Sequence, residues 1–199
     1  MEGSTTITQR VGDAKAQEVL REHNTIIREA LKAHGGSEIK HTGDGVMASF
    51  PTASRALECA IAVQQGFAER NESVPAHPEP VEGRAERQPS AHGSTGSPRA
   101  DSGVGAPNAR EPIRVRIGLN AGEPVAEDKD LFGTAVQLAA RVCARAEPGQ
   151  VLASNVVREL AAGKGFLFSD QGDVVLRGFE DPVRLYELRW EPQSGEGQA

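Results

Sequence analysis

The feature that most constrains the fold is a short turn between two apolar runs, which itself lies between two helical patterns. Residues 42–45 read Thr-Gly-Asp-Gly, and an Asp-Gly pair in this setting predicts a β-hairpin over residues 37–50. Before it, residues 13–34 carry apolar side chains at helical spacing, and Gly35-Gly36 predicts the end of that helix. After it, Pro51 predicts the start of a second helix. The first part of the chain is therefore expected to fold as helix, hairpin, helix.

Residues 73–110 interrupt this pattern. They are rich in Pro, Gly and Ser and contain no Leu, Ile, Met, Phe, Tyr or Trp. Such a segment cannot bury enough apolar surface to offset the entropy lost on ordering. We expect a disordered insertion within one domain that spans residues 1–190, followed by a flexible tail over residues 191–199.

Regular patterns return after the insertion. Alternating apolar residues predict a half-buried strand over residues 113–119, with residues 122–127 as its hairpin partner. A helix is expected over residues 133–146. Shorter patterns predict a strand at 150–153, a helix at 155–161, and strands at 166–168, 174–176 and 183–188. The order indicates an α+β fold with helices on one face of a largely antiparallel sheet.

Composition narrows the functional classes. The net charge of -6 argues against a nucleic-acid or membrane footprint, which would need clustered Lys and Arg. No segment approaches the roughly 20 apolar residues that a membrane-spanning helix requires. Cys59 and Cys143 lie in helical patterns without framework spacing, so we interpret both as small core residues in a reducing cytoplasm. A soluble, cytoplasmic protein is expected.

Two segments about ninety residues apart hold the candidate functional side chains. Asp44 lies on the Gly-flanked turn, where a carboxylate could meet Mg²⁺, although such turns are common for purely structural reasons. Lys40 points outward from its strand and by itself is an ordinary solvated lysine. Asp130 is expected at the head of a helix, where it could equally serve as a cap. Gln137 and Arg141 are one helical turn apart and share a face.

These two segments together resemble the catalytic domain of class III adenylate and guanylate cyclases. The resemblance covers residues 2–72 and 111–190, and it includes the stretches 118–124 and 176–188. It implies a ferredoxin-like nucleotide cyclase fold and the conversion of ATP to 3′,5′-cyclic AMP and pyrophosphate in signal transduction.

The resemblance also assigns roles to the candidate residues. Lys40 would donate to a ring nitrogen of adenine and Asp130 would accept from its exocyclic amine, which favours ATP over GTP. Arg141 would stabilise charge on the phosphate, and an arginine fork suits that task. Gln137 stands where the family usually has Asn, which orients the ribose. Asp44 would bind metal, with two Mg²⁺ or Mn²⁺ ions per site in an intact family member.

The start of the chain departs from the family pattern. Gly3, Ser4 and Thr5 resemble a phosphate-binding cradle before the first helix. The family's preceding strand, which is central to its sheet and ends in Phe-Thr-Asp, has no counterpart here, and its second metal aspartate is missing with it. We expect this truncated form to be impaired. A misassigned start codon and a truncated gene both explain the pattern, and we favour the first because Lys40, Asp44, Asp130 and Arg141 remain.

Family sites form between two subunits, so the resemblance implies a homodimer or a heterodimer with another cyclase domain. Two other functions stay open. The chain could be a non-catalytic partner that lends Lys40, Asp130 and Arg141 to an intact cyclase, or it could be a plain nucleotide-binding module.

Overall fold

The computed structural model describes residues 13–41, 45–72, 112–128 and 130–191. Its helices and strands follow one another as α2 Asp13–Ala33, β1 Ser37–His41, β2 Val46–Ser49, α3 Ala53–Glu72, β3 Ile117–Leu119, β4 Val125–Glu127, β5 Asp130–Phe132, α4 Thr134–Arg145, β6 Val151–Ser154, α5 Asn155–Leu160, β7 Phe168–Val174 and β8 Val183–Leu188. The expected insertion at 73–110 lies outside the described residues. So does the expected tail, apart from its first residue.

The first helix and the hairpin form as the sequence predicts. Helix α2 ends at Ala33, and Gly35 adopts a left-handed φ of 67° while the Gly36 amide donates to the Leu31 carbonyl at 2.8 Å. This is the glycine-dependent helix end that satisfies late carbonyl groups. Strands β1 and β2 pair antiparallel, with His41 opposite Val46. The hairpin prediction over residues 37–50 is confirmed.

Helix α3 begins later than Pro51 predicts. Its first residue is Ala53, and the Thr52 hydroxyl accepts a hydrogen bond from the Arg55 amide at 3.3 Å. Threonine is therefore the cap, because its side-chain oxygen satisfies an amide of the first turn that has no helical partner. Pro51 lies one position before this cap and not in the helix.

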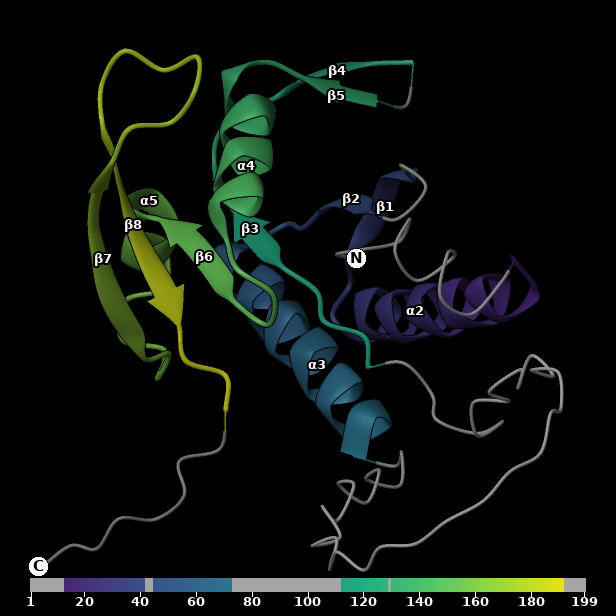
Figure 1. The fold of residues 1–199 in the computed structure, drawn as a ribbon. Helices are drawn as coiled ribbons and strands as arrows, with labels where there is room; N and C mark the ends of the chain where they lie inside the picture. Colours follow the sequence, from purple (N-terminus) through teal and green to yellow (C-terminus); the bar gives the residue numbers. More distant parts are fainter. Residues whose placement is uncertain (1–12, 42–44, 73–111, 129, 192–199) are drawn as a thin grey trace, which may run out of the picture.

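A four-stranded sheet in the order β3-β6-β8-β7 forms the centre of the fold (Figure 1). Strands β3 and β6 are parallel, whereas β6 with β8 and β8 with β7 are antiparallel. A parallel pair needs a crossover connection, and helix α4 supplies it. The α+β class with a mainly antiparallel sheet is confirmed.

The prediction of helices on one face is wrong. All four residues of β6 are buried, and neighbouring residues of a strand point to opposite faces. Val151 and Ala153 pack in a cluster with Leu57 of α3 and Val157 of α5, whereas Leu152 packs with Val142 of α4. Helices therefore cover both faces of this sheet.

Three strand predictions also need correction, two of them around β3. The ladder of β3 covers Ile117–Leu119 only, although Ile113 and Val115 are buried as the alternation predicts. Backbone groups of Ile113 and Val115 bond side chains of α3 in place of a neighbouring strand. The Asn71 side chain bonds both the amide and the carbonyl of Ile113, and the Gln64 side chain donates to the Val115 carbonyl. In addition, β4 pairs with β5 and not with β3.

The third correction concerns residues 166–176, where two strands were predicted and one strand, β7, runs over Phe168–Val174. Its polar centre resembles a turn in the sequence. However, β7 is at the edge of the sheet, where polar side chains can face solvent. A register shift between Asp170 and Gly172 leaves Gln171 without a strand-pairing partner on β8, and Gly172 adopts a left-handed φ of 74° beside it.

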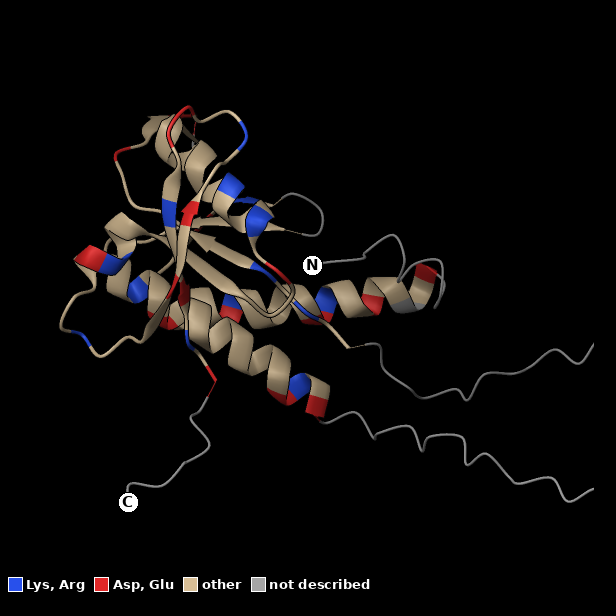
Figure 2. Cartoon of the chain, turned by 60° about the vertical axis from the view of Figure 1, so that its left-hand side comes forward, with Lys and Arg blue, Asp and Glu red and all other residues tan. Residues whose placement is uncertain are grey.

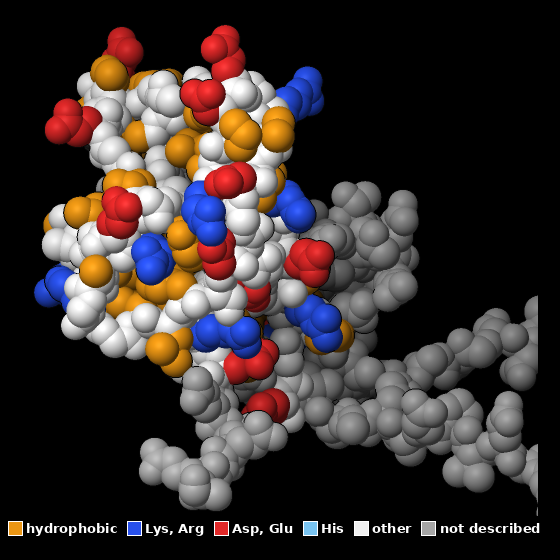
Figure 3. Space-filling model, turned by 90° about the vertical axis from the view of Figure 1, so that its left-hand side faces the viewer, with side chains coloured by type: hydrophobic (Ala, Val, Ile, Leu, Met, Phe, Trp, Pro, Cys, Tyr) orange, Lys and Arg blue, Asp and Glu red, His pale blue; other side chains and the backbone are white. Residues whose placement is uncertain are grey.

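The sequence predicts no clustered positive charge, two core cysteines and no membrane-spanning helix, and the structure bears on each. Lys and Arg are interspersed with Asp and Glu over the described part of the chain (Figure 2), and the face shown in Figure 3 mixes both signs with apolar side chains. Cys59 is buried, and burial raises the pKa of its thiol to about 11. Burial also raises the pKa of the Cys143 thiol. Among the described helices, none combines the length and apolar character needed to span a bilayer.

Candidate active site

The structure brings Lys40 and Asp130 into direct contact, although they are far apart in sequence. The Lys40 Nζ donates to Asp130 Oδ2 at 2.7 Å. Lys40 extends from β1 with its side chain 54% exposed, and the Asp130 side chain is 23% exposed. An ion pair at this exposure adds little to stability, so its position between two elements is more informative than its strength.

Asp130 does not lie at the head of a helix as expected, and the alternative role as a cap does not apply. It is the first residue of strand β5, and α4 begins at Thr134 behind Gly133, which provides no side-chain cap. Its Oδ1 instead accepts the Leu131 amide at 2.9 Å. The Lys40 hydrogen bond, followed by that of Leu131, holds the pKa of Asp130 below its ordinary value of 3.8. With a lowered carboxyl pKa, the midpoint at which the pair is lost as the pH falls lies below 3.8.

Hairpin β4–β5 positions Asp130. Val125 pairs with Phe132 and Glu127 with Asp130, and Asp128 in the turn has a left-handed φ of 47°. Figure 1 shows this hairpin extending from the head of α4 above the β1–β2 hairpin. The aspartate is thus carried by the tip of one hairpin to the side of the other.

Gln137 and Arg141 lie on α4, directly after the β4–β5 hairpin. Both are exposed, and their spacing of four residues places them on one face of the helix. The backbone amide of Gln137 donates to the Gly133 carbonyl at 3.1 Å, so Gln137 belongs to the first turns of α4. The side-chain amide of Gln137 and the guanidinium of Arg141 are therefore open to solvent beside the hairpin that carries Asp130.

Four predicted site residues lie outside the described residues, namely Asp44, Gly3, Ser4 and Thr5. In the sequence, Asp44 falls between β1, which ends at His41, and β2, which begins at Val46. The described residues contain no group of three or more His, Cys, Asp or Glu that could hold a metal ion. Asp44 remains the metal ligand that the sequence predicts.

One partly buried polar link was not predicted as part of the site. Asn120, at the end of β3, donates to the Ala135 carbonyl of α4 at 3.0 Å and accepts from the Ser154 hydroxyl at 2.7 Å. The sequence carries no local signal for this link, because its three members lie on separate elements.

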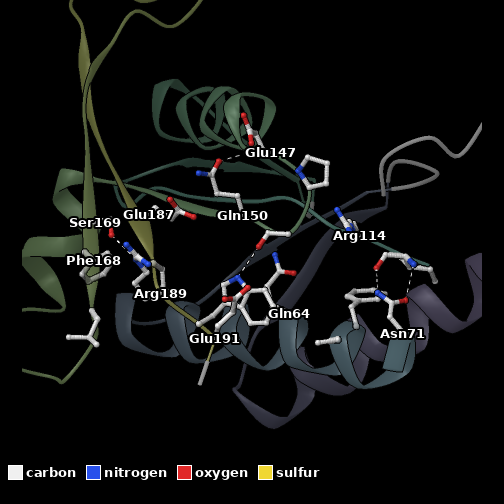
Figure 4. Close-up of a pocket in the computed structure, with 18 residues that line it drawn as sticks. Gln64, Asn71, Arg114, Glu147, Gln150, Phe168, Ser169, Glu187, Arg189 and Glu191 are labelled. Atoms are coloured by element: carbon white, nitrogen blue, oxygen red, sulfur yellow. Dashed lines mark hydrogen bonds between the residues drawn. The ribbon is translucent and has the colours of Figure 1, made fainter. Parts of the chain in front are cut away.

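A cavity of about 950 Å³ lies elsewhere, between α3, the turn before β6 and the ends of β7 and β8 (Figure 4). Its lining includes Gln64, Asn71, Arg114 and Trp190. None of the predicted site residues of the described part lines it. The cavity is thus separate from the Lys40–Asp130 pair.

Comparison with known proteins decides the family. The model of the family described as "Adenylate and Guanylate cyclase catalytic domain" matches residues 1–189. This chain belongs to that family. It is 32% identical over 169 residues to "Putative adenylate cyclase 3" of Rhizobium meliloti, covering 84% of this chain and 23% of that protein.

Solved cyclase structures share the fold of this family member. The adenylate/guanylate cyclase/hydrolase from Silicibacter pomeroyi superposes with a TM-score of 0.63 at 30% identity, covering 86% of this chain and 84% of that one. An adenylate cyclase from Trypanosoma brucei gives 0.67 at 23% identity over 96% and 87% of the two chains, which shows the fold alone. The chain spans 23% to 39% of the length of the first curated relatives that it matches. The predicted nucleotide cyclase fold is confirmed.

Proposed function

We propose that this cyclase domain converts ATP to 3′,5′-cyclic AMP and pyrophosphate. The observation that carries the proposal is the meeting of Lys40 and Asp130 at 2.7 Å. A cation beside a carboxylate offers one donor and one acceptor, which matches the ring nitrogen and exocyclic amine on the edge of adenine. Relatives named as adenylate cyclases in Rhizobium meliloti and Podospora anserina support the same substrate.

The carboxylate of Asp130 has acceptor positions left with which to bond a base. A carboxylate has about four acceptor positions, and the Lys40 and Leu131 donors occupy one on each oxygen of Asp130. An exocyclic amine can therefore bond Asp130 without displacing Leu131. The edge of guanine presents a carbonyl oxygen and a protonated ring nitrogen instead, so the same two side chains would place a donor opposite a donor.

Arg141 and Gln137 complete the nucleotide side of the proposed site. In the reaction the ribose 3′-oxygen bonds to the α-phosphorus, the bond from that phosphorus to the β-phosphate oxygen breaks, and the hydroxyl proton passes to solvent. Negative charge builds up on phosphate oxygens, which the Arg141 fork is suited to stabilise. Gln137, on the same helix face, would hold the ribose through its amide.

Asp44 would hold the metal. Mg²⁺ in nucleotide sites takes one or two protein carboxylates and completes its shell with phosphate oxygens and water, so a single carboxylate such as that of Asp44 fits this ion. Mg²⁺ or Mn²⁺ bound there would supply Lewis-acid stabilisation of phosphate charge. The backbone of Gly3, Ser4 and Thr5 would bind the phosphates as a cradle.

Two copies of the chain are proposed to form the site. Val125 and Phe132 face each other across the β4–β5 hairpin and are 64% and 47% exposed. Large exposed apolar side chains beside a site mark a surface for association. A homodimer would set Asp44 of one copy opposite Lys40, Asp130 and Arg141 of the other, and a heterodimer with another cyclase domain would do the same. We also propose a cytoplasmic location, in keeping with reduced cysteines.

The decisive experiment measures cyclic AMP after incubation of the chain with ATP and Mg²⁺ or Mn²⁺. A version extended upstream through any in-frame Phe-Thr-Asp codons is assayed beside it. Product that disappears on Asp44→Ala would support the proposal. Arg28→Gln is the matched control, since it removes the Arg28–Glu38 ion pair of 3.0 Å at β1 without touching the site.

A second candidate is a partner or nucleotide-binding role, favoured by one observation. The described residues bring together Lys40 and Asp130, which we propose read the base, and a partner that lends only these two residues needs no metal ligand of its own. If neither version makes product alone but mixing with an intact cyclase domain restores it, the chain is a partner. ATP binding with no product in any mixture would contradict the enzyme and leave a binding module.

A further inference from the structure

Helix α4, which carries Gln137 and Arg141, is held against strand β3 with little between them. A Cβ placed on Gly118 would lie 2.1 Å from the backbone nitrogen of Cys143, so only glycine permits this approach. At the other end of the helix, a Cβ on Gly122 would lie 2.7 Å from the Ala135 side chain. Glycine packing lets the helix lie close but, since it is non-directional, does not set where the helix lies along the strand.

Asn120 supplies the directional link. It lies between these two glycines, and its side-chain nitrogen donates to the Ala135 carbonyl at 3.0 Å. This carbonyl belongs to the first turn of α4, two residues before Gln137. A carbonyl has two lone pairs, so the helix keeps its own hydrogen bonds while Asn120 ties its first turn to the end of β3.

Ser154 holds the amide of Asn120 in this orientation. The Ser154 side chain is buried, and its hydroxyl donates to Asn120 Oδ1 at 2.7 Å. Serine at the N-cap of a helix normally bonds a backbone amide of the first turn. Ser154 occupies the N-cap of α5 yet makes no such cap bond. Its hydroxyl bonds Asn120 and makes no hydrogen bond to the first turn of α5.

We infer that Asn120 is a positioning residue, which together with Ser154 sets where α4 presents Gln137 and Arg141 to the nucleotide. The inference rests on the proposed function, but the geometry that carries it does not. Lys40 and Asp130 lie on β1 and β5, outside this link. The residues proposed to bind the base and those proposed to bind the ribose and phosphate are therefore positioned by separate contacts.

Two variants test the inference, Asn120→Asp and the milder Ser154→Ala. The first replaces the donor to Ala135 by an acceptor, and the second removes the donor to Asn120. Gln64→Glu is the matched control, because the buried Gln64 amide also donates to a backbone carbonyl, that of Val115 at 3.1 Å, but on the α3 side of the fold. Amide hydrogen exchange of α4 and α3 is measured in each protein.

In both test variants, the backbone amides of the first two turns of α4 are expected to exchange about tenfold faster, which is the effect of one lost hydrogen bond. Exchange in α3 should stay unchanged. Binding of 3′-deoxy-ATP with Mg²⁺, which cannot cyclise, is expected to weaken severalfold while its preference over 3′-deoxy-GTP stays the same. In the control, any rise in exchange should appear around α3 and β3 or throughout the chain.

Unchanged exchange in α4 for both variants, or an equal rise in α3, would overturn the inference. A purely structural role would lower the melting temperature and raise exchange everywhere. Failure of the proposed function looks different, because the unmodified chain would then not bind 3′-deoxy-ATP while the exchange pattern still decides whether Asn120 positions α4.

Discussion

Lys40 and Asp130 are the residues on which the proposed nucleotide preference depends. Replacing both, as Lys40→Glu with Asp130→Cys, exchanges the donor and the acceptor, so that Glu can accept from the protonated ring nitrogen of guanine and Cys can donate to its carbonyl oxygen. We expect the ratio of ATP to GTP turnover or binding to fall by at least about tenfold for each mismatched polar contact, because unpaired polar groups are costly in a bound complex. The ratio is measured by competition between the two nucleotides.

The control for this exchange is the neighbouring ion pair. Arg28→Gln breaks a contact to Glu38, two positions before Lys40 on the same strand. It should leave the nucleotide ratio unchanged. An equal shift in the control, or no shift in the double variant, would remove the base-reading role from the pair.

The two thiols provide a second test at the scale of single residues. With the pKa of Cys59 at about 11 in place of 9.0, only about 0.1% of this thiol is ionised at pH 8, and the thiolate is the reactive form. We expect Cys59 and Cys143 to react with Ellman's reagent far more slowly in the folded chain than in guanidinium chloride. Fast reaction of both thiols in the native chain would contradict the burial of Cys59 and the partial burial of Cys143.

The same shift affects stability, and its sign is definite. Because the folded state keeps the Cys59 proton when the unfolded state loses it, the free energy of unfolding should decrease as the pH rises above 9. Cys59→Ala should remove this part of the pH dependence. Denaturant midpoints at pH 8 and pH 10 measure it.

At the scale of elements, the contact between β3 and α4 is the most sensitive. Gly118→Ala would place a methyl group against the backbone of Cys143, so strand and helix must separate. We expect a loss of about 3 kcal/mol in the free energy of unfolding, at the upper end of the range for overpacking. Urea denaturation measures the change.

Gly66→Ala is the comparison for that variant. Gly66 is inside α3, and a Cβ there meets only the Ile26 side chain at 3.0 Å. Alanine is about 1 kcal/mol better than glycine in a helix, which offsets the tight contact, so little net change is expected. Similar losses in both variants would show that the close approach of α4 is not special.

Some elements could be predicted from sequence and others could not. Helix α2 and the β1–β2 hairpin follow from local signals, namely helical periodicity, a terminal glycine and an Asp-Gly turn. The pairing of β4 with β5, and not with β3, has no local signal because it depends on which strand edge is near in space. Strand β7 continues through a polar centre that a strand pattern does not predict, because an edge strand tolerates polar side chains that a central strand does not.

At the scale of the whole molecule, the proposed site is shared between two copies. Arg141→Ala and Asp44→Ala should each abolish product, and an equal mixture should recover about a quarter of the original activity. Half of randomly formed dimers are mixed, and each mixed dimer has one intact site out of two. The assay uses whichever version of the chain, as given or extended, makes cyclic AMP.

A mixture as inactive as its components would indicate a site built from one copy. Phe132→Ser provides the structural control, because it removes an exposed apolar side chain of the β4–β5 hairpin. It should shift the chain toward monomer in sedimentation velocity. It should also prevent recovery of activity on mixing.

The sequence by itself determined the local elements, the family and the candidate residues, because periodicity, turn chemistry and spaced motifs are all written along the chain. Only the tertiary structure decided that Lys40 and Asp130 meet, that helices cover both faces of the sheet, and that Ser154 bonds Asn120 and leaves α5 uncapped. These contacts join residues that are distant in sequence. Their formation depends on how β3, α4 and the two hairpins pack together, which no local pattern encodes.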